Sequence, residues 1–223
     1  TWAPALTGGV PTGYTVYIGT TEGTIYDENS FNVTNTHFNP VTEGLMTFNF
    51  LDRYYWTVEA TNADGSAVVD PPFSFEIQAD PRVNLPYTQD FGTDTTMPLN
   101  WTQTSDGSTI WTVSASNNAG GTASEMKGRW VSLDGITRLI TPPINTTGLS
   151  MFQVRFNHLF DDFGAGITAK LQYSHDLATW TDTQFSITSG GGNVTGLATA
   201  LISGISSPTT YVAWVLDGNH YHF

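Results

Sequence analysis

The stretch from Leu51 to Gly65, LDRYYWTVEATNADG, constrains the fold of this chain more than any other. Its apolar side chains alternate with polar ones, so that Tyr54, Trp56 and Val58 fall on one face. A period of two over this length predicts a β-strand with one buried side, and the Asn-Ala-Asp-Gly at its end predicts a turn. We therefore expect it to be the central strand of a β-domain.

The composition agrees with a β-rich chain. At 223 residues, one large or two ordinary β-domains are expected. Hydrophobic residues make up 39% and aromatic residues 13%, which is enough to build cores, while only 12% are charged, which excludes a charge-rich disordered chain. The chain has no cysteine, and this removes disulfides, thiol nucleophiles and cysteine-based zinc sites together.

The chain is strongly acidic. Its net charge of −13 repels phosphate groups, so neither nucleic acid nor an anionic membrane is an expected partner. Two explanations of the acidity remain open: a solubilising surface, or aspartates that hold Ca²⁺. No signal peptide, transmembrane run or lipidation motif is visible, so no membrane insertion is expected in this segment.

Three further stretches of residues 1–79 alternate in the same way. Each is short and is bounded by glycine or proline. No window of ten residues keeps a 3.6-residue period, so no helix is expected here. The predicted strands are Gly13 to Gly19, Asn32 to Pro40 and Pro72 to Ile77.

Residues 1–79 resemble a fibronectin type III domain, an immunoglobulin-like β-sandwich. The resemblance rests on residues 2–4 (Trp-Ala-Pro), 13–17 and 54–65. It implies that Trp2 is a core tryptophan and that Tyr54 is a corner tyrosine, whose hydroxyl bonds back to the preceding loop. The family's first strand and most of its second would precede Trp2, so the domain is expected to be incomplete at its N-terminus.

A linker of residues 80–86, with two prolines, is expected to join this domain to a second one that spans residues 84–223. About eight strands spaced by turns predict a two-sheet sandwich with the topology of a jelly roll. The predicted strands are Tyr87 to Phe91, Pro98 to Trp101, Ile110 to Val113, Gly128 to Leu133, Thr137 to Ile144, Met151 to Phe163, Ile167 to Ser174, Asn193 to Ile202 and Thr210 to Leu216.

The second half resembles cleaved-adhesin and choice-of-anchor domains, which are jelly rolls related to MAM domains and recur in large secreted proteins of Bacteroidota-like bacteria. The matching pieces are residues 85–91, 98–101, 106–111, 138–144 and 173–180. The family's closing strand, with its acidic pair, would follow Phe223, so this domain is expected to be incomplete at its C-terminus. The predicted fold class is therefore all-β, with two tandem sandwiches.

Candidate metal sites follow from this resemblance and from histidine spacing. Related adhesin jelly rolls hold Ca²⁺ through acidic residues, and Asp90 and Asp106 match two of the positions. The resemblance thus implies that these two residues bind Ca²⁺. His220 and His222 could point the same way on a strand, but terminal histidines are usually surface residues and no third ligand can be placed. His158 lies on a Phe-rich face, where a hydrogen-bonded core or rim histidine is expected.

Seven tryptophans invite a carbohydrate-binding interpretation, because aromatic faces stack on sugar rings. Most of them lie in alternating strands, so core packing explains them first. Trp180, which follows a predicted turn, is the candidate ligand-binding residue.

No catalytic constellation is found. The chain lacks a Gly-x-Ser-x-Gly elbow, a His-Glu-x-x-His motif and a phosphate-binding glycine loop, so it is not expected to be an enzyme. We expect a secreted or cell-surface, structural or adhesive module of a large bacterial surface or filament protein. Its expected partners are neighbouring domains, copies of the same protein, glycans or other surface proteins. The alternative is a carbohydrate-binding accessory module of a secreted hydrolase.

Overall fold

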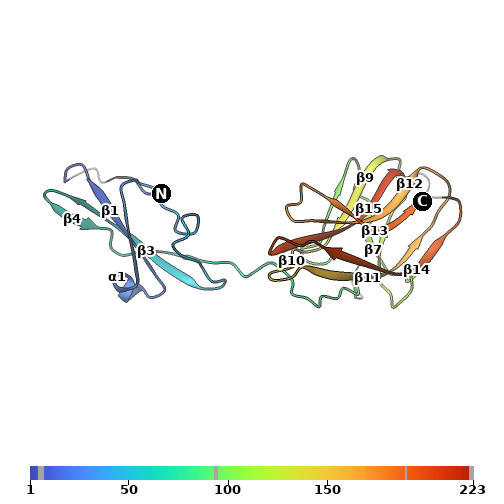
Figure 1. Ribbon diagram of the computed structural model, residues 1–223, viewed down its shortest axis with the longest axis horizontal. Helices are drawn as coiled ribbons and strands as arrows, with labels where there is room; N and C mark the ends of the chain where they lie inside the picture. Colours follow the sequence, from blue (N-terminus) through green and yellow to red (C-terminus); the bar gives the residue numbers. More distant parts are fainter. Residues whose placement is uncertain (5–7, 93–94, 189, 221–223) are drawn as a thin grey trace. The chain divides into compact units, whose positions relative to one another are not determined.

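The computed structural model describes residues 1–4, 8–92, 95–188 and 190–220, and within them the regular secondary structure consists of β-strands, one 3₁₀ turn and one four-residue helix. The chain divides into two compact units, unit 1 (Thr1–Asp80) and unit 2 (Pro81–Phe223). Each unit has its own strands and its own hydrophobic clusters (Figure 1). Among the described residues, no helix is long and apolar enough to cross a membrane.

Unit 1 is organised around β3 (Arg53–Asn62), as its alternation predicts. One edge of β3 pairs along seven residues with β1, and the other edge pairs with β4 and then β5. The sheet order is β2-β1-β3-β4, with β5 also on β3. The remaining bounds are β1 (Gly13–Gly19), β2 (Asn29–Val33), β4 (Gly65–Val68) and β5 (Phe73–Glu76).

The core of unit 1 forms on the predicted face of β3. Tyr54 and Val58 are buried there against Val16 of β1, and Trp2 packs on this cluster with its ring edge-on to Tyr14. The Tyr54 hydroxyl accepts a hydrogen bond from the backbone N–H of Asn49 at 3.1 Å, which confirms the expected contact with the preceding loop.

Two predictions for unit 1 are wrong: the strand expected from Asn32 to Pro40 is β2, which already ends at Val33, and helical turns occur where none were expected. A 3₁₀ turn, η1 (Glu22–Thr24), and a four-residue helix, α1 (Ile25–Glu28), lie between β1 and β2, where no helix was expected. The carboxylate of Glu28 accepts hydrogen bonds from the backbone N–H groups of Thr20 and Thr21, and Ile25 is fully buried. This single turn is therefore stabilised by tertiary contacts, which a search for helical periodicity over ten residues does not detect.

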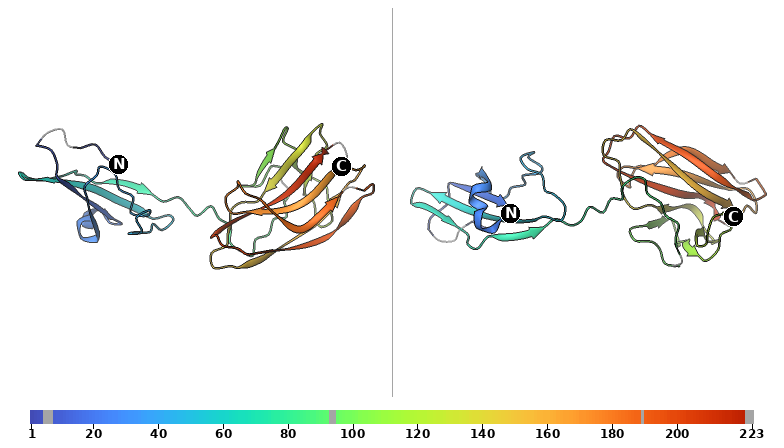
Figure 2. Two further views of the ribbon diagram at one scale, coloured as in Figure 1. Left: turned by 45° about the horizontal axis from the view of Figure 1, so that its top comes forward. Right: turned by 90° about the horizontal axis from the view of Figure 1, so that it is seen from below.

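Unit 2 has a six-stranded antiparallel sheet, which the views in Figures 1 and 2 show as one of its layers. Its order is β13-β12-β15-β9-β6, with β10 also on β15. The bounds are β6 (Thr102–Ser105), β9 (Asp134–Ile140), β10 (Ile144–Asn145), β12 (Ile167–Ser174), β13 (Thr181–Thr188) and β15 (Thr209–Asn219).

The remaining named strands of unit 2 form two separate pairs. β11 (Met151–Phe160) pairs with β14 (Val194–Ser203) over ten residue pairs, and β7 (Trp111–Ser114) pairs with β8 (Glu125–Gly128). The even-numbered side chains of β11, such as Phe152 and Phe156, face a core that includes Leu171, Ile202 and Val212.

Three predicted strands of unit 2 differ from the structure. Residues 87–91 and 98–101 lie outside the named strands, and the predicted strand of residues 128–133 is replaced by β8, which ends at Gly128. These segments are held by side-chain contacts instead: the Trp101 indole N–H donates to the Tyr87 hydroxyl at 3.0 Å. Part of the expected linker is bonded to unit 2, because the backbone of Val83 pairs with residues 143 and 145.

Candidate functional site

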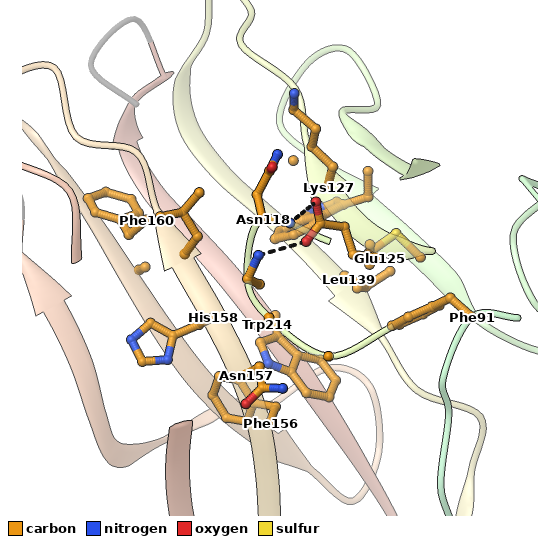
Figure 3. Close-up of a pocket in the computed structure, with 18 of the residues that line it drawn as sticks. Phe91, Asn118, Glu125, Lys127, Leu139, Phe156, Asn157, His158, Phe160 and Trp214 are labelled. Carbon is orange, nitrogen blue, oxygen red and sulfur yellow. Dashed lines mark hydrogen bonds between the residues drawn. The ribbon is translucent and has the colours of Figure 1, made fainter. Parts of the chain in front are cut away.

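A cleft of about 790 Å³ lies within unit 2, between β11 and β8. Its lining includes consecutive residues of both strands, from Arg155 to Phe160 on β11 and from Glu125 to Gly128 on β8, together with the adjoining Asp161 and Ser124. Figure 3 shows Phe156, His158 and Trp214 together on one side of the cleft, with Glu125, Asn118 and Lys127 on the other. We call this space the β11–β8 cleft.

Each of the two strands, β11 and β8, has one edge without a paired strand among the described residues. Among the described residues β11 pairs only with β14, and β8 pairs only with β7. The backbone N–H of Gly192 donates to the carbonyl of Asp162 in the continuation of the β11–β14 ladder. In an antiparallel ladder bonded residues alternate, so the even-numbered residues of β11 bond to β14. The N–H and C=O groups of Gln153, Arg155 and Asn157 therefore point to the other edge.

The inner wall of the cleft is aromatic. Trp101 and Trp214 stack with ring centroids 5.8 Å apart and an interplanar angle of 24°. Phe156 meets Trp214 edge-on at 5.4 Å, and Phe91 meets Trp101 edge-on at 5.6 Å. These rings use one another as packing partners, so the wall presents apolar surface and ring edges more than open ring faces.

Two polar atoms at the cleft have no hydrogen-bond partner in the described part of the chain. They are Nδ1 of His158 and Nε1 of Trp111, and both are shielded from solvent. Burial lowers the pKa of His158 below its usual value, so the neutral imidazole is favoured. A hydrogen-bonded histidine was predicted at this position. The prediction is wrong for the Nδ1 atom of His158, which has no hydrogen-bond partner in the described part of the chain. A shielded polar atom without a partner carries a desolvation cost in the folded protein.

The outer wall is held by Glu125. Its carboxylate accepts hydrogen bonds from the backbone N–H groups of Asn118 and Ala119, at 3.0 and 2.9 Å (Figure 3). These bonds lower the pKa of Glu125 against the opposing effect of burial. They fix the loop of residues 115–124, whose Gly121, at φ +88°, lies next to the Asn157 side chain of β11. Glu125 is therefore a structural carboxylate here.

The rim of the cleft carries two cations, Arg155 on β11 and Lys127 on β8, and both residues are exposed. No ion pair is found for Arg155 within residues 1–4, 8–92, 95–188 and 190–220. A third cation of the lining, Lys170, is paired with Asp217 at 2.8 Å.

Each predicted calcium ligand accepts a hydrogen bond from a backbone N–H group. Asp90 accepts from the N–H of Gly92 at 3.0 Å, and Asp106 accepts from the N–H of Ile136 at 2.8 Å. The described residues contain no group of three histidines or carboxylates that could hold a metal ion. Calcium binding by Asp90 and Asp106 stays a prediction.

The predicted ligand-binding residue, Trp180, lies away from the cleft lining. It packs against Ile140, Ala213 and Val215, and the Arg138 guanidinium lies 5.3 Å from its ring centroid. One ring face is therefore covered by a cation, which reduces its use as a stacking platform.

Of the two histidines considered as metal ligands, His220 and His222, the structure describes His220. His220 is fully buried, and its ring bonds to Thr137 Oγ1 and to the carbonyl of Gly218. His222 lies outside the described residues. The expectation that His220 is a surface residue is wrong, because the end of β15 packs against residues 133–137.

The chain was compared with known proteins. No family model matches it, and no curated protein matches it. One similar solved structure comes from work on the promiscuous specificity of carbohydrate-binding modules from the β-sandwich superfamily. It is 9% identical, with a TM-score of 0.38, over 96% of this chain and 81% of that one.

Proposed function

We propose that this chain is a non-catalytic binding module of an extracellular, multi-domain bacterial surface or filament protein. In this proposal unit 2 holds a partner in the β11–β8 cleft, and unit 1 is a fibronectin-type spacer. The observation that supports it is the cleft itself, which combines an apolar wall with strand edges that have no neighbouring strand among the described residues. These are the features of a surface built to be covered.

The test asks whether the cleft is open and binds in solution. The apolar dye anilinonaphthalene sulfonate is expected to bind the whole chain at a single saturable site. Ala169→Trp, on β12 in the cleft lining, should abolish this binding by filling the space, whereas Ala178→Trp, at an exposed position outside it, should not. Absence of a dye signal, or equal signals from both variants, would overturn the proposal.

A carbohydrate is the second candidate ligand. It is favoured by the mixture of aromatic rings with amide, carboxylate and cationic side chains in one cleft, a lining that suits hydroxyl-rich rings. A glycan array with the wild-type chain, Ala169→Trp and Trp180→Ala tests this function. Glycan binding that is lost in Ala169→Trp places the sugar in the cleft, and loss in Trp180→Ala alone supports the sequence-based site.

A further inference from the structure

The loop between β7 and β8 reaches from one wall of the β11–β8 cleft to the other. It covers residues 115–124, and residues 118–122 line the cleft. Its tip lies against β11: a Cβ atom on Gly120 would lie 3.9 Å from Cγ of Asn157, and one on Gly121 would lie 3.5 Å from Nδ2. We call residues 115–124 the strap, because they connect the two walls.

The strap is hydrogen-bonded on the β8 side. The Glu125 carboxylate, at the start of β8, accepts from the backbone N–H groups of Asn118 and Ala119 (Figure 3). The N–H of Gly120 donates to the carbonyl of Asn117 at 2.9 Å. Residues 117–120 therefore form a compact turn that is attached to β8 through one carboxylate.

The contacts of the strap on the β11 side are weaker. In the part of the chain that the structure describes, no hydrogen bond joins the strap to Asn157. From residue 117 to residue 123 every residue except Ala119 is exposed, and no described side chain of the strap belongs to a hydrophobic cluster of unit 2. A segment with few buried apolar contacts opens at a lower free energy than the strands around it.

We infer that the strap is a lid on the β11–β8 cleft, which pivots at Glu125 and lifts away from Asn157. This inference rests on the proposed function of the cleft, and it holds for any ligand that the cleft accepts. Glu125 is the positioning residue, because its two charge-assisted bonds keep the turn in shape and attached to β8. Lifting breaks no described hydrogen bond to Asn157, so it costs less free energy than separating β11 from β14, which share ten residue pairs.

A disulfide between the strap and β11 tests whether the lid must lift. The chain has no cysteine, so Gly120→Cys with Asn157→Cys introduces a single pair of thiols at the contact. In the whole chain, anilinonaphthalene sulfonate should associate at least about tenfold more slowly with the oxidised form than with the reduced form. Both forms contain the same cysteine at the positive φ of position 120, so backbone strain there does not affect the comparison. Equal rates would overturn the inference, as would failure of the disulfide to form.

A matched disulfide leaves the strap free. Met151 and Ser203 lie opposite one another in the β11–β14 pair, and both are exposed and outside the cleft lining. Met151→Cys with Ser203→Cys should bind the dye at the same rate when oxidised and when reduced. A slower rate in its oxidised form would show that stiffening of β11 limits entry, and this would also overturn the inference.

Amide hydrogen exchange of the ¹⁵N-labelled chain tests the pivot without a ligand. Glu125→Gln keeps the side-chain shape and removes its charge, so the Asn118 and Ala119 amides should exchange at least about threefold faster. The Val154 and Phe156 amides, which bond to β14, should keep their wild-type rates. Unchanged exchange at Asn118 and Ala119, or equal acceleration of all four amides, would overturn the inference.

The two measurements separate the lid from the binding site. If the dye binds the wild-type chain but associates equally fast with the oxidised and reduced forms of the strap variant, the lid inference alone fails. If the dye does not bind the wild-type chain, the proposed function fails, and the lid inference fails with it because it rests on that function.

Discussion

Two ten-residue strands, β3 in unit 1 and β11 in unit 2, have nearly the same pattern and different surroundings. Each alternates aromatic and polar residues, and each turns its aromatic row to a core, although β3 also buries Thr57 on the opposite face. β3 has β1 on one edge and β4 and β5 on the other, whereas β11 has β14 on one edge and the cleft on the other. The period of two reports which face of a strand is buried, and it contains no information about how many edges are paired.

The largest difference in stability between the two strands is expected when proline replaces an odd-numbered residue of β3 and of β11. Tyr55 lies opposite Gly19 on one side and Ser74 on the other, so Tyr55→Pro breaks a ladder bond and leaves a buried carbonyl unsatisfied. We expect a loss of about 3 kcal/mol in the free energy of unfolding of unit 1. Asn157→Pro removes an N–H that points into the cleft, and should cost less than about 1 kcal/mol. Urea unfolding of the two variants measures this, and equal losses would refute the assignment of the β11 edge.

A matched pair of side-chain changes should have opposite signs. Tyr54→Phe removes a buried hydroxyl that accepts from Asn49, and should lower the free energy of unfolding by about 1–2 kcal/mol. His158→Phe removes an Nδ1 without a partner and keeps a ring, and should raise it by about 1 kcal/mol. Denaturant titrations of the two purified variants measure the sign of each change in the free energy of unfolding. Destabilisation by His158→Phe would show that Nδ1 has a partner in solution.

The same histidine should make the stability of unit 2 depend on pH. Its pKa in the folded protein is lowered from 6.5 by burial, so below pH 6.5 the unfolded chain binds a proton that the folded chain does not. Stability should therefore fall as the pH drops from about 6.5 to the lowered pKa, and be flat above. His158→Phe should reduce this slope, whereas His37→Gln, at an exposed position, should keep it. Unchanged slopes in both would contradict the prediction.

Calcium has the smallest expected effect. If Asp90 and Asp106 hold the ion, the thermal midpoint of the wild-type chain is higher in calcium than in EGTA, and the difference disappears in Asp106→Asn. Differential scanning calorimetry measures both midpoints. The sequence-based prediction of a calcium site is rejected by identical wild-type midpoints.

Strand faces were predictable from the sequence because they depend on local alternation. The burial of Tyr54 and Val58 and the inward face of β11 follow from it. The bounds of β12 were also predicted, but its burial does not alternate. Residues 22–28 were not predictable, since one turn of helix has no period and is held by Glu28 and Ile25. Residues 87–91 and 98–101 were predicted as strands but lie outside the named strands, and the Trp101–Tyr87 bond and aromatic packing hold them instead.

The cleft was harder to predict than the strands. It depends on which edges remain unpaired, and this is a property of distant strands brought together by the fold. One local signal existed: His158 interrupts the inward row of phenylalanines in residues 152–160. A polar ring in an otherwise apolar row marks a place where the interior is incomplete. Trp111 and Trp214 carry no such mark, because alternating tryptophans look alike whether they line a core or a cleft.

The attachment of Val83 has a mechanical consequence. Its N–H donates to Pro143 and its carbonyl accepts from Asn145, while the Arg82 guanidinium donates to the carbonyl of Pro208. A pull applied to the chain ahead of unit 2 therefore loads these bonds first, and β10 passes the load to β15 in the middle of the six-stranded sheet. Tension is therefore carried to β15, which pairs with β9, β10 and β12. The edge of β11 lies outside this loaded path.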